Sequence, residues 1–484
     1  IYTKEIVPIL SIAIFDCILI IKGRPMKKLF SIIFLIIFVA NCDKKQSPLK
    51  DFVTNNDPAF SYEIVETIKG EKWTTKIVKM VSQKWLSEDD VDLQEWWHWL
   101  TIVIPDDREE TEALMVVSGG NHKNNVPNEA NELLIGAAVG TKSVIASISN
   151  IPFQALNYKK DNNRELYEDD IIAYGWRQFL EGGAKDEDAY WLAHLPMTKA
   201  VMRGMDVVQE IANVDSFVVT GGSKRGWTTW TTGISDPRVK AIIPIVIDLL
   251  NVVPSFDHHW KCYGDWSPAI DSYKNEGIMD WMGSNEFNRM LEIMEPYSFV
   301  KELTLPKFLI NATGDEFFVT DSWQFYWDDL IGQKYLQYIP NANHGLNGSY
   351  NLGSLVAFYD SVIKDKSIPK FDWKIDGNII IVEIPAQGVE YEIRKWTAIN
   401  EKARDFRVAV IGRTWESESI PVSDNGHYSI QIDSPETGYK AGLIEVIFKT
   451  DPNYPMTFTS GTIVTPNSYP FNEFKSKLPK GTFH

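Results

Sequence analysis

The stretch from Val214 to Gly233 reads VDSFVVTGGSKRGWTTWTTG and decides the fold. It opens with a short apolar, β-branched run, Phe217 to Thr220, of the kind that forms a buried parallel strand. The run stops at a Gly-Gly-Ser turn that ends in Ser223, and a Trp- and Thr-rich stretch that can be helical follows. A serine at a tight turn between strand and helix indicates a nucleophile elbow, because the turn exposes the hydroxyl and the helix N-terminus favours negative charge on the reacting oxygen.

The glycines around Ser223 match the common G-x-S-x-G pattern only in part. Gly221 lies two residues before the serine, but Arg225 lies two residues after it and the glycine is displaced to Gly226. A glycine-rich turn with an incidental serine is therefore the alternative interpretation of this stretch.

Two later strand-like runs end in an acid and a histidine. Lys307 to Ala312 (KFLINA) precedes Asp315, and Tyr335 to Ile339 (YLQYI) precedes His344. The order Ser, Asp, His is the chain order of the α/β-hydrolases, in which a doubly wound sheet brings the loops at the carboxyl ends of its strands together. We therefore predict a catalytic triad of Ser223, Asp315 and His344.

Few other residues can fill the roles of base and acid. The chain has eight histidines, and beyond the predicted acid only His344, His427 and His484 remain. His427 and His484 lie beyond Phe371, where the sequence pattern differs from that of the preceding part. Glu316 is an alternative acid whose side chain should point the other way, and Asp248, after the preceding strand, is a second alternative.

A Gly-Gly loop follows another buried strand, Ala113 to Val117 (ALMVV). In α/β-hydrolases the loop at this place gives one N–H of the oxyanion hole, and the residue after the nucleophile gives the other. We predict the backbone of Gly120 or Asn121 for the first donor and that of Lys224 for the second, without distinguishing between the first two.

Three motifs carry a resemblance to a known family. Gly221 to Trp230 (GGSKRGWTTW), Leu195 to Ala200 (LPMTKA) and Ile463 to Pro466 (IVTP), with Tyr469-Pro470 after the last, look like the PhoPQ-activated pathogenicity-related protein family. The resemblance runs from about Asp57 to Tyr469. It implies an α/β-hydrolase fold followed by a β domain and says little about substrate, and the displaced glycine also resembles the family's own pattern.

The expected fold class is α/β: an α/β-hydrolase doubly wound, mostly parallel sheet with a helical cap insertion, followed by a C-terminal all-β sandwich. An aromatic and acidic stretch before Lys307 is typical of a cap. From Phe371 the chain reads as short alternating strands, one of them Phe406 to Ile411. The predicted segments are 1–41 (upstream segment and signal peptide), 42–57 (tether), 58–368 (hydrolase domain, with the cap at about 249–305), 369–472 (β-sandwich domain) and 473–484 (tail).

The N-terminal residues read as a bacterial lipoprotein signal. Met26, the predicted initiator, is followed by two lysines, by an apolar run from Leu29 to Ala40, and by Cys42, which would be lipidated. A membrane-spanning anchor is the competing interpretation, but the run is shorter than the roughly 20 apolar residues that a span needs. We expect an exported lipoprotein, periplasmic or associated with the outer membrane, that meets the membrane only through this anchor.

Charge and cysteine content limit the partners. The net charge of −17 argues against nucleic acid, because a phosphate backbone would be repelled. Besides Cys17 and Cys42, both within the signal region, Cys262 is the one remaining cysteine, and we expect a packed thiol rather than a nucleophile. His258 and His259 are adjacent and complete no metal-ligand set, so we expect neither metal nor cofactor. The sequence does not indicate an oligomeric state.

The predicted activity is cleavage of an ester or amide in a small molecule or peptide. A peptidase would need carboxylates near the pocket to hold an α-ammonium group, and the cap offers Asp257, Asp265, Asp271 and Glu276. Residues 157–170 are polar and are expected to form a surface excursion near the mouth of the site. The competing class is a non-catalytic protein of hydrolase fold that signals or binds through its surface or β domain.

Overall fold

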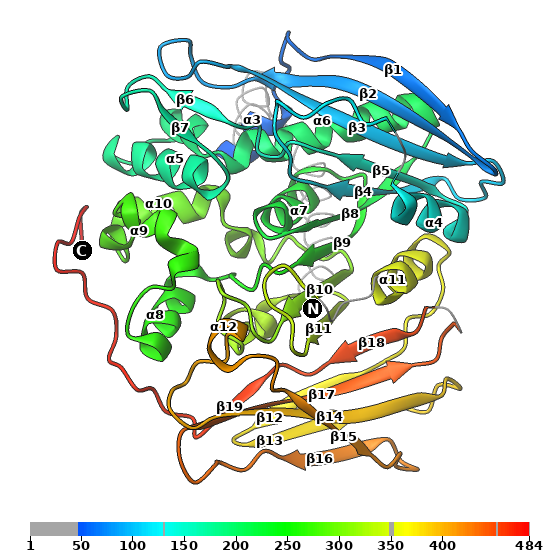
Figure 1. The fold of residues 1–484 in the computed structure, drawn as a ribbon, viewed down its shortest axis with the longest axis vertical. Coiled ribbons are helices and arrows are strands. Elements are labelled where there is room, and N and C mark those ends of the chain that lie inside the picture. The colour runs from blue at the N-terminus through cyan, green and yellow to red at the C-terminus, as the bar shows by residue number, and fades with distance from the viewer. Residues whose placement is uncertain (1–46, 129–130, 348–352, 452–453, 484) are drawn as a thin grey trace, which may run out of the picture. The chain divides into compact units, whose positions relative to one another are not determined.

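Nine strands form a central sheet in the part of the chain that the structure describes (Figure 1). The computed structural model describes residues 47–484 except 129–130, 348–352, 452–453 and 484, and residues from Pro48 onward form one compact unit. The predicted initiator Met26, the signal segment and Cys42 lie outside the described residues. No helix in the described part is long and apolar enough to cross a membrane.

The strand order across the sheet is β1-β2-β3-β5-β4-β8-β9-β10-β11. The first three strands pair antiparallel, β3 is also antiparallel to β5, and the remaining neighbours are parallel. This mostly parallel sheet with a reversal of strand order at β5 and β4 confirms the predicted α/β-hydrolase class. The strands are β1 (Ser61–Lys69), β2 (Trp73–Lys84), β3 (Glu95–Pro105), β4 (Glu112–Val117), β5 (Val144–Ile148), β8 (Ser216–Gly222), β9 (Val239–Ile245), β10 (Lys307–Ala312) and β11 (Lys334–Ile339).

Helices cover both faces of the sheet, so the parallel strands are buried on each side. Along β8, Phe217 and Val219 join the hydrophobic core beneath α6 and α7, whereas Val218 joins the core beneath α4 and α11. Burial on two faces is why these strands read as continuous apolar runs. The helices are α4 (Glu132–Thr141), α5 (Asp169–Glu181), α6 (His194–Ala212), α7 (Lys224–Ser235) and α11 (Gly353–Ile363), and a short hairpin of β6 (Leu156–Tyr158) and β7 (Arg164–Leu166) precedes α5.

The connection between β9 and β10 is helical, as expected for a cap. Of its α-helices, α9 and α10 lie beside α5, whereas α8 lies further from it (Figure 1). They are α8 (Val252–Tyr263), α9 (Asp271–Asn275) and α10 (Asn285–Met294), interspersed with short 3₁₀ helices at Pro268–Ile270, Ile278–Trp281 and Pro296–Phe299.

Two antiparallel sheets follow among the described C-terminal residues. One has the order β12-β13-β16, and the other has the order β15-β14-β17-β18 with β19 also on β17. Their facing side chains, such as Ile380, Ile393 and Val446, share one hydrophobic core, which agrees with the predicted all-β sandwich. The strands are β12 (Asp372–Asp376), β13 (Ile379–Glu383), β14 (Tyr391–Asn400), β15 (Glu416–Ile420), β16 (His427–Gln431), β17 (Tyr439–Phe448), β18 (Met456–Thr459) and β19 (Ile463–Thr465).

The predicted strand at Phe406–Ile411 is wrong. Between β14 and β15 the chain leaves the sheet, and Val408–Ile411 forms a helical turn, α12. Here Val408 N–H donates to the carbonyl oxygen of Gly314 (3.0 Å), and the buried Arg404 pairs with Asp321 (2.5 Å). These contacts therefore hold the segment to the hydrolase part of the chain in place of pairing with a neighbouring strand; Phe406 is buried, whereas Val410 is exposed.

The predicted tether is partly a packed helix. Pro48–Thr54 forms α3, which contacts α6 and buries Leu49 and Val53 completely. Two apolar residues four apart on a helix share one face, so this short helix can dock although polar residues surround it in the sequence.

The predicted tail lies along the cap. Phe471 N–H donates to Lys261 O of α8, and the ring of Phe474 packs 4.9 Å from that of Trp260. Further along, Thr482 N–H donates to the carboxylate of Glu286 in α10 (2.8 Å). The tail thus joins the first and last α-helices of the cap.

Candidate active site

Ser223 occupies the turn between β8 and α7 with φ 59° and ψ −128°. A positive φ is strained for a non-glycine residue and is what a nucleophile elbow requires. A Cβ at Gly221 would lie 2.7 Å from the carbonyl oxygen of Arg225. A Cβ at Gly226 would lie 2.8 Å from Ile247 Cγ2. The displaced glycine is therefore required where α7 meets the chain after β9, and the incomplete motif does not argue against an elbow.

The loops after β10 and β11 bring the predicted acid and base together. Asp315 Oδ2 lies 2.8 Å from His344 Nδ1, and Asp315 Oδ1 accepts a hydrogen bond from Phe317 N–H (2.7 Å). The aspartate is buried, while the histidine is partly exposed. A buried carboxylate on Nδ1 fixes the tautomer that leaves Nε2 free to accept a proton.

The two alternative acids have other partners. Glu316 accepts the backbone N–H of His344 (2.8 Å), so its carboxylate binds the main chain of the base. Asp248 accepts hydrogen bonds from the hydroxyls of Tyr326 and Tyr338. Burial raises the pKa of Asp248 to about 7, although both tyrosine hydrogen bonds lower it. Among these carboxylates, Asp315 is the one that binds the ring of His344.

Ser223 and His344 share a neighbour, Phe317, although His344 itself does not line the cavity beside Ser223. Phe317 lines the cavity together with Ser223, and its ring packs 4.2 Å from that of His344. Both residues are described, and no hydrogen bond joins their side chains. In structures without substrate, catalytic hydrogen bonds are commonly long and tighten in the complex.

The predicted oxyanion-hole residues follow two adjacent strands, β4 and β8. Val117 of β4 pairs with Gly221 of β8, so the loop containing Gly120 starts beside the elbow. Gly120 has φ 147°, and a Cβ there would lie 3.0 Å from a backbone nitrogen. Lys224 is the first residue of α7, so its N–H has no carbonyl partner within the helix. All three predicted residues are described; Lys224 lines the cavity, whereas Gly120 and Asn121 do not.

A cluster of charged residues surrounds the elbow. Lys224 Nζ lies 2.8 Å from Glu168 and 2.9 Å from Asp169, and Arg225 Nη2 lies 2.6 Å from Glu168. Burial alone would raise the pKa of Glu168, but the hydrogen bond from Arg225 and the charges of Lys224 and Arg225 lower it to about 2. Gln154 Nε2 donates to both Glu168 and the carbonyl oxygen of Gly120.

These acids have no role that is predicted from the sequence. Residues 157–170 are predicted to lie near the mouth of the site, and the end of that range forms ion pairs with the two residues after Ser223. The one available signal was a run of three acids, Glu168-Asp169-Asp170, in a chain whose elbow carries Lys224-Arg225. Opposite charges in distant segments do not indicate which basic segment the acidic run binds.

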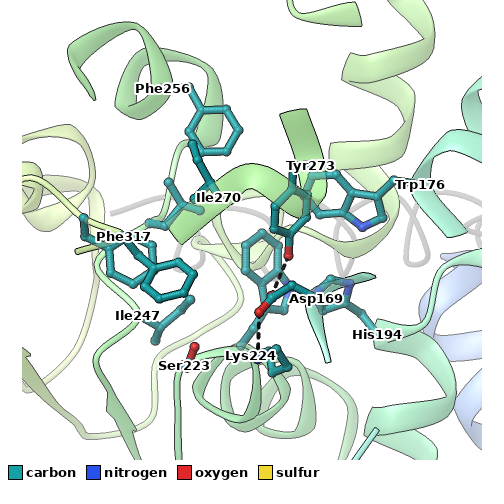
Figure 2. A pocket seen from close by; sticks show the side chains of 13 residues that line it. Asp169, Trp176, His194, Ser223, Lys224, Ile247, Phe256, Ile270, Tyr273 and Phe317 are labelled. Atoms are coloured by element: carbon teal, nitrogen blue, oxygen red, sulfur yellow. Dashed lines mark hydrogen bonds and ion pairs between the residues drawn. The ribbon is translucent and has the colours of Figure 1, made fainter. Parts of the chain in front are cut away.

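The cavity beside Ser223 has a volume of about 40 Å³. Figure 2 shows apolar side chains, among them Phe256, Ile270 and Phe317, on one side of it. On the other side lie aromatic and polar groups, including Asp169, Tyr273 and His194 (Figure 2). The predicted cap acids are Asp257, Asp265, Asp271 and Glu276; all four are described and none of them lines the cavity.

His194 is a buried, neutral part of this lining. Burial and, to a smaller extent, the charge of Lys224 lower its pKa to about 3. Its Nδ1 has no hydrogen-bond partner among the described residues. The ring packs against Trp227, with centroids 4.8 Å apart.

Comparison with known proteins identifies the family. A family model described as PhoPQ-activated pathogenicity-related protein matches residues 49–407. The chain belongs to this PhoPQ-related family. A relative, autocrine proliferation repressor protein A from Dictyostelium discoideum, is 34% identical over 478 residues, which is 92% of this chain and 95% of that protein.

The PhoPQ-related chain also resembles solved structures at low identity. Acetyl xylan esterase from Paenibacillus sp. R4 is 12% identical with a TM-score of 0.45, and the match covers 66% of this chain and 92% of the esterase. Acylaminoacyl peptidase from Pyrococcus horikoshii is 14% identical with a TM-score of 0.40, and the match covers 64% of this chain and 51% of the peptidase.

The cap histidines of this PhoPQ-related protein have separate partners. His258 lies 2.8 Å from Asp321 and 3.0 Å from the hydroxyl of Tyr469, whereas His259 Nε2 accepts the N–H of Ser267. Cys262 is buried, and burial raises the pKa of its thiol. Such a thiol is a weak nucleophile, which agrees with its expected packing role. The described residues contain no group of three potential metal ligands.

Proposed function

We propose that this protein is a cofactor-independent serine hydrolase that cleaves an ester or an amide through an acyl-enzyme. Ser223 Oγ attacks the substrate carbonyl carbon while His344 takes the serine proton. His344 then gives that proton to the leaving group. Asp315 holds the imidazole in the tautomer that this transfer needs and stabilises the imidazolium that forms.

The observation that carries the proposal is the 2.8 Å contact between Asp315 and His344, whose ring packs on Phe317 of the cavity that contains the strained Ser223. Deacylation reverses the roles: His344 takes a proton from water, and the resulting hydroxide attacks the acyl carbon and releases Ser223. Negative charge develops on the carbonyl oxygen in both steps. The N–H of Lys224 and one N–H from the loop of Gly120 or Asn121 are our candidates to bind it.

We further propose that the enzyme is exported and held at a membrane by a lipid on Cys42. The lysines after Met26, the apolar run Leu29–Ala40 and the position of the cysteine support this. Metabolic labelling with a radioactive fatty acid in a bacterial host should mark the wild type and leave a Cys42→Ala variant unmarked. Equal labelling of both proteins would contradict the proposed anchor.

A second candidate is a binding or signalling protein that uses the hydrolase fold without catalysis. The relative at 34% identity is named as a proliferation repressor, and its similarity extends over nearly the whole chain. If this candidate is correct, no substrate is turned over, and replacing Ser223 leaves the biological effect unchanged.

The deciding experiment is labelling of the full-length protein with a fluorophosphonate, which reacts with activated serines. We expect the wild type and Ser235→Ala, a substitution in the last turn of α7, to be labelled, and Ser223→Ala to remain unlabelled. Circular dichroism establishes that each variant is folded. A folded wild type without labelling would overturn the hydrolase proposal in favour of the second candidate.

A further inference from the structure

The cavity beside Ser223 is small. At about 40 Å³ it has room for about three water molecules, since each needs roughly 10–15 Å³ measured in this way. Its walls include Trp227, Phe256 and Ile270, all of which are nearly inaccessible to solvent. A bulky group enters only if these packed side chains are displaced, and forcing extra methylenes into a packed site is costly.

Its charges are already matched. Lys224 Nζ binds Asp169 (2.9 Å) and Glu168 (2.8 Å), and the hydroxyl of Tyr273 donates to Asp169 (3.0 Å). The buried His194 beside them is neutral. An ammonium group on the substrate would compete with Lys224 for Asp169, and a carboxylate would compete with Asp169 for Lys224. Either would put one charge in excess of its partners in a largely buried place, which is unfavourable.

The enclosed position of the cavity indicates which half of the substrate it holds. In acyl transfer the leaving group departs first, while the acyl group stays on the serine until water arrives. A cavity that lies next to Ser223 and is bounded by buried residues suits the part that stays. The leaving group then needs no enclosed site of its own.

We propose that this cavity is the acyl pocket and that it takes a short, uncharged acyl group of two or three carbons, acetyl or propionyl, from an ester. The proposal rests on the proposed function and narrows it. Ser223 Oγ bonds to the acyl carbon as the bond from that carbon to the leaving oxygen breaks, and the serine proton passes through His344 to the alcohol. Water then releases the short carboxylic acid.

The test is a chain-length series on the full-length protein with p-nitrophenyl acetate, butyrate and hexanoate, together with alanine p-nitroanilide as the charged acyl substrate. We expect kcat/KM for the acetate to exceed that for the hexanoate by at least about 100-fold, because methylenes that do not fit a pocket each reduce the rate severalfold or more. The alanine anilide should be cleaved more slowly than the acetate by a larger factor.

Two variants of the same type show whether the cavity sets this preference. Ile270→Ala shortens a side chain that lines the cavity, whereas Ile278→Ala shortens a buried cap side chain that does not. The first should reduce the acetate-to-hexanoate ratio at least tenfold, and the second should leave it within about twofold. Their melting temperatures show whether the two variants lose comparable stability.

Three results would overturn the acyl-pocket proposal: equal turnover of acetate and hexanoate, preference for the alanine anilide, or the same acetate-to-hexanoate ratio in both isoleucine variants. In each of these cases, turnover that requires Ser223 would leave the hydrolase proposal intact. Failure of every ester, together with absence of fluorophosphonate labelling at Ser223, would overturn both.

Discussion

His344 binds two successive acids in different ways: its ring contacts Asp315, and its backbone N–H donates to Glu316. One carboxylate therefore orients the imidazole, and the other fixes the loop that carries it. Asp315→Asn should lower kcat by about 10³- to 10⁴-fold, because an amide does not enforce the required tautomer. Glu316→Gln should lower kcat by less than about tenfold. Steady-state kinetics on both variants is the measurement, and equal losses would show that the two acids had been assigned wrongly.

The buried Asp248 predicts a pH-dependent stability. Burial raises its pKa to about 7, whereas an unfolded aspartate titrates near pH 4. Between about pH 4 and pH 7 the native state therefore holds a proton that the unfolded state lacks. The stability that this group contributes is fully present below that window and is lost as the pH rises through it.

Asp248→Asn removes this titration. Its free energy of unfolding, measured relative to the wild type, should increase across the window by up to about 1.4 kcal/mol per pH unit. Urea unfolding at several pH values between 4 and 8 measures the difference, and buried groups elsewhere cancel because both proteins contain them. A difference that does not change with pH would contradict the assignment.

Glu168 should matter for both activity and stability. It pairs with Lys224 and Arg225 and, through Gln154, is linked to the carbonyl of Gly120, so it fixes both predicted oxyanion loops. Glu168→Gln should lower kcat by about 10²-fold through misplacement of these loops. Because the carboxylate is partly exposed, the cost in unfolding free energy should be only about 1–2 kcal/mol.

Neutralising Asp170 provides the control for Glu168. It is two residues further along and pairs with neither Lys224 nor Arg225 in the described structure. Similar losses of kcat in the Glu168 and Asp170 variants would argue against a specific role of Glu168.

The lowered pKa of Glu168 also predicts a pH-dependent stability. The stability difference between Glu168→Gln and wild type should shrink as the pH falls from about 4.5 toward 2, since the carboxylate then takes up a proton in both states.

The C-terminal tail should stabilise the cap. Removing residues 471–484 takes away the contact of Phe474 with Trp260 and the hydrogen bond from Thr482 to Glu286. We expect faster amide hydrogen exchange in α8 and α10 and unchanged exchange in β8, because opening free energies are local. Phe474→Ala should reproduce the effect in α8 at a cost of about 1–3 kcal/mol, less than for a fully buried ring. Unchanged exchange in the cap would show that the tail only rests on it.

The strands and the candidate triad could be predicted because each rests on a local pattern. Parallel strands buried on both faces give apolar runs, as in Phe308–Ile310 of β10, and each candidate triad residue follows such a strand at a short distance. Asp315 could be preferred to Glu316 because neighbouring side chains point in different directions, and their different partners on His344 agree with that expectation.

Other features depend on contacts between distant segments. No repeating pattern in the sequence links Glu168 to Lys224, and the polar stretch that contains Glu168 is typical of a protein surface. The alternation at Phe406–Ile411 resembles a strand, yet Val408 donates a hydrogen bond to Gly314, next to the candidate acid Asp315. The buried Arg404 likewise gives no local sign that Asp321, across the chain, neutralises it.

The segment between β14 and β15 determines how this protein can be divided. Val408 binds Gly314, the residue immediately before Asp315, and Arg404 reaches into the hydrolase part to bind Asp321. A fragment that stops at residue 368 would expose the loop that contains Asp315 and would leave the buried carboxylate of Asp321 without Arg404. The C-terminal sheets are therefore not an interchangeable accessory, because exchanging them for another domain would remove contacts that support the loop of the candidate acid.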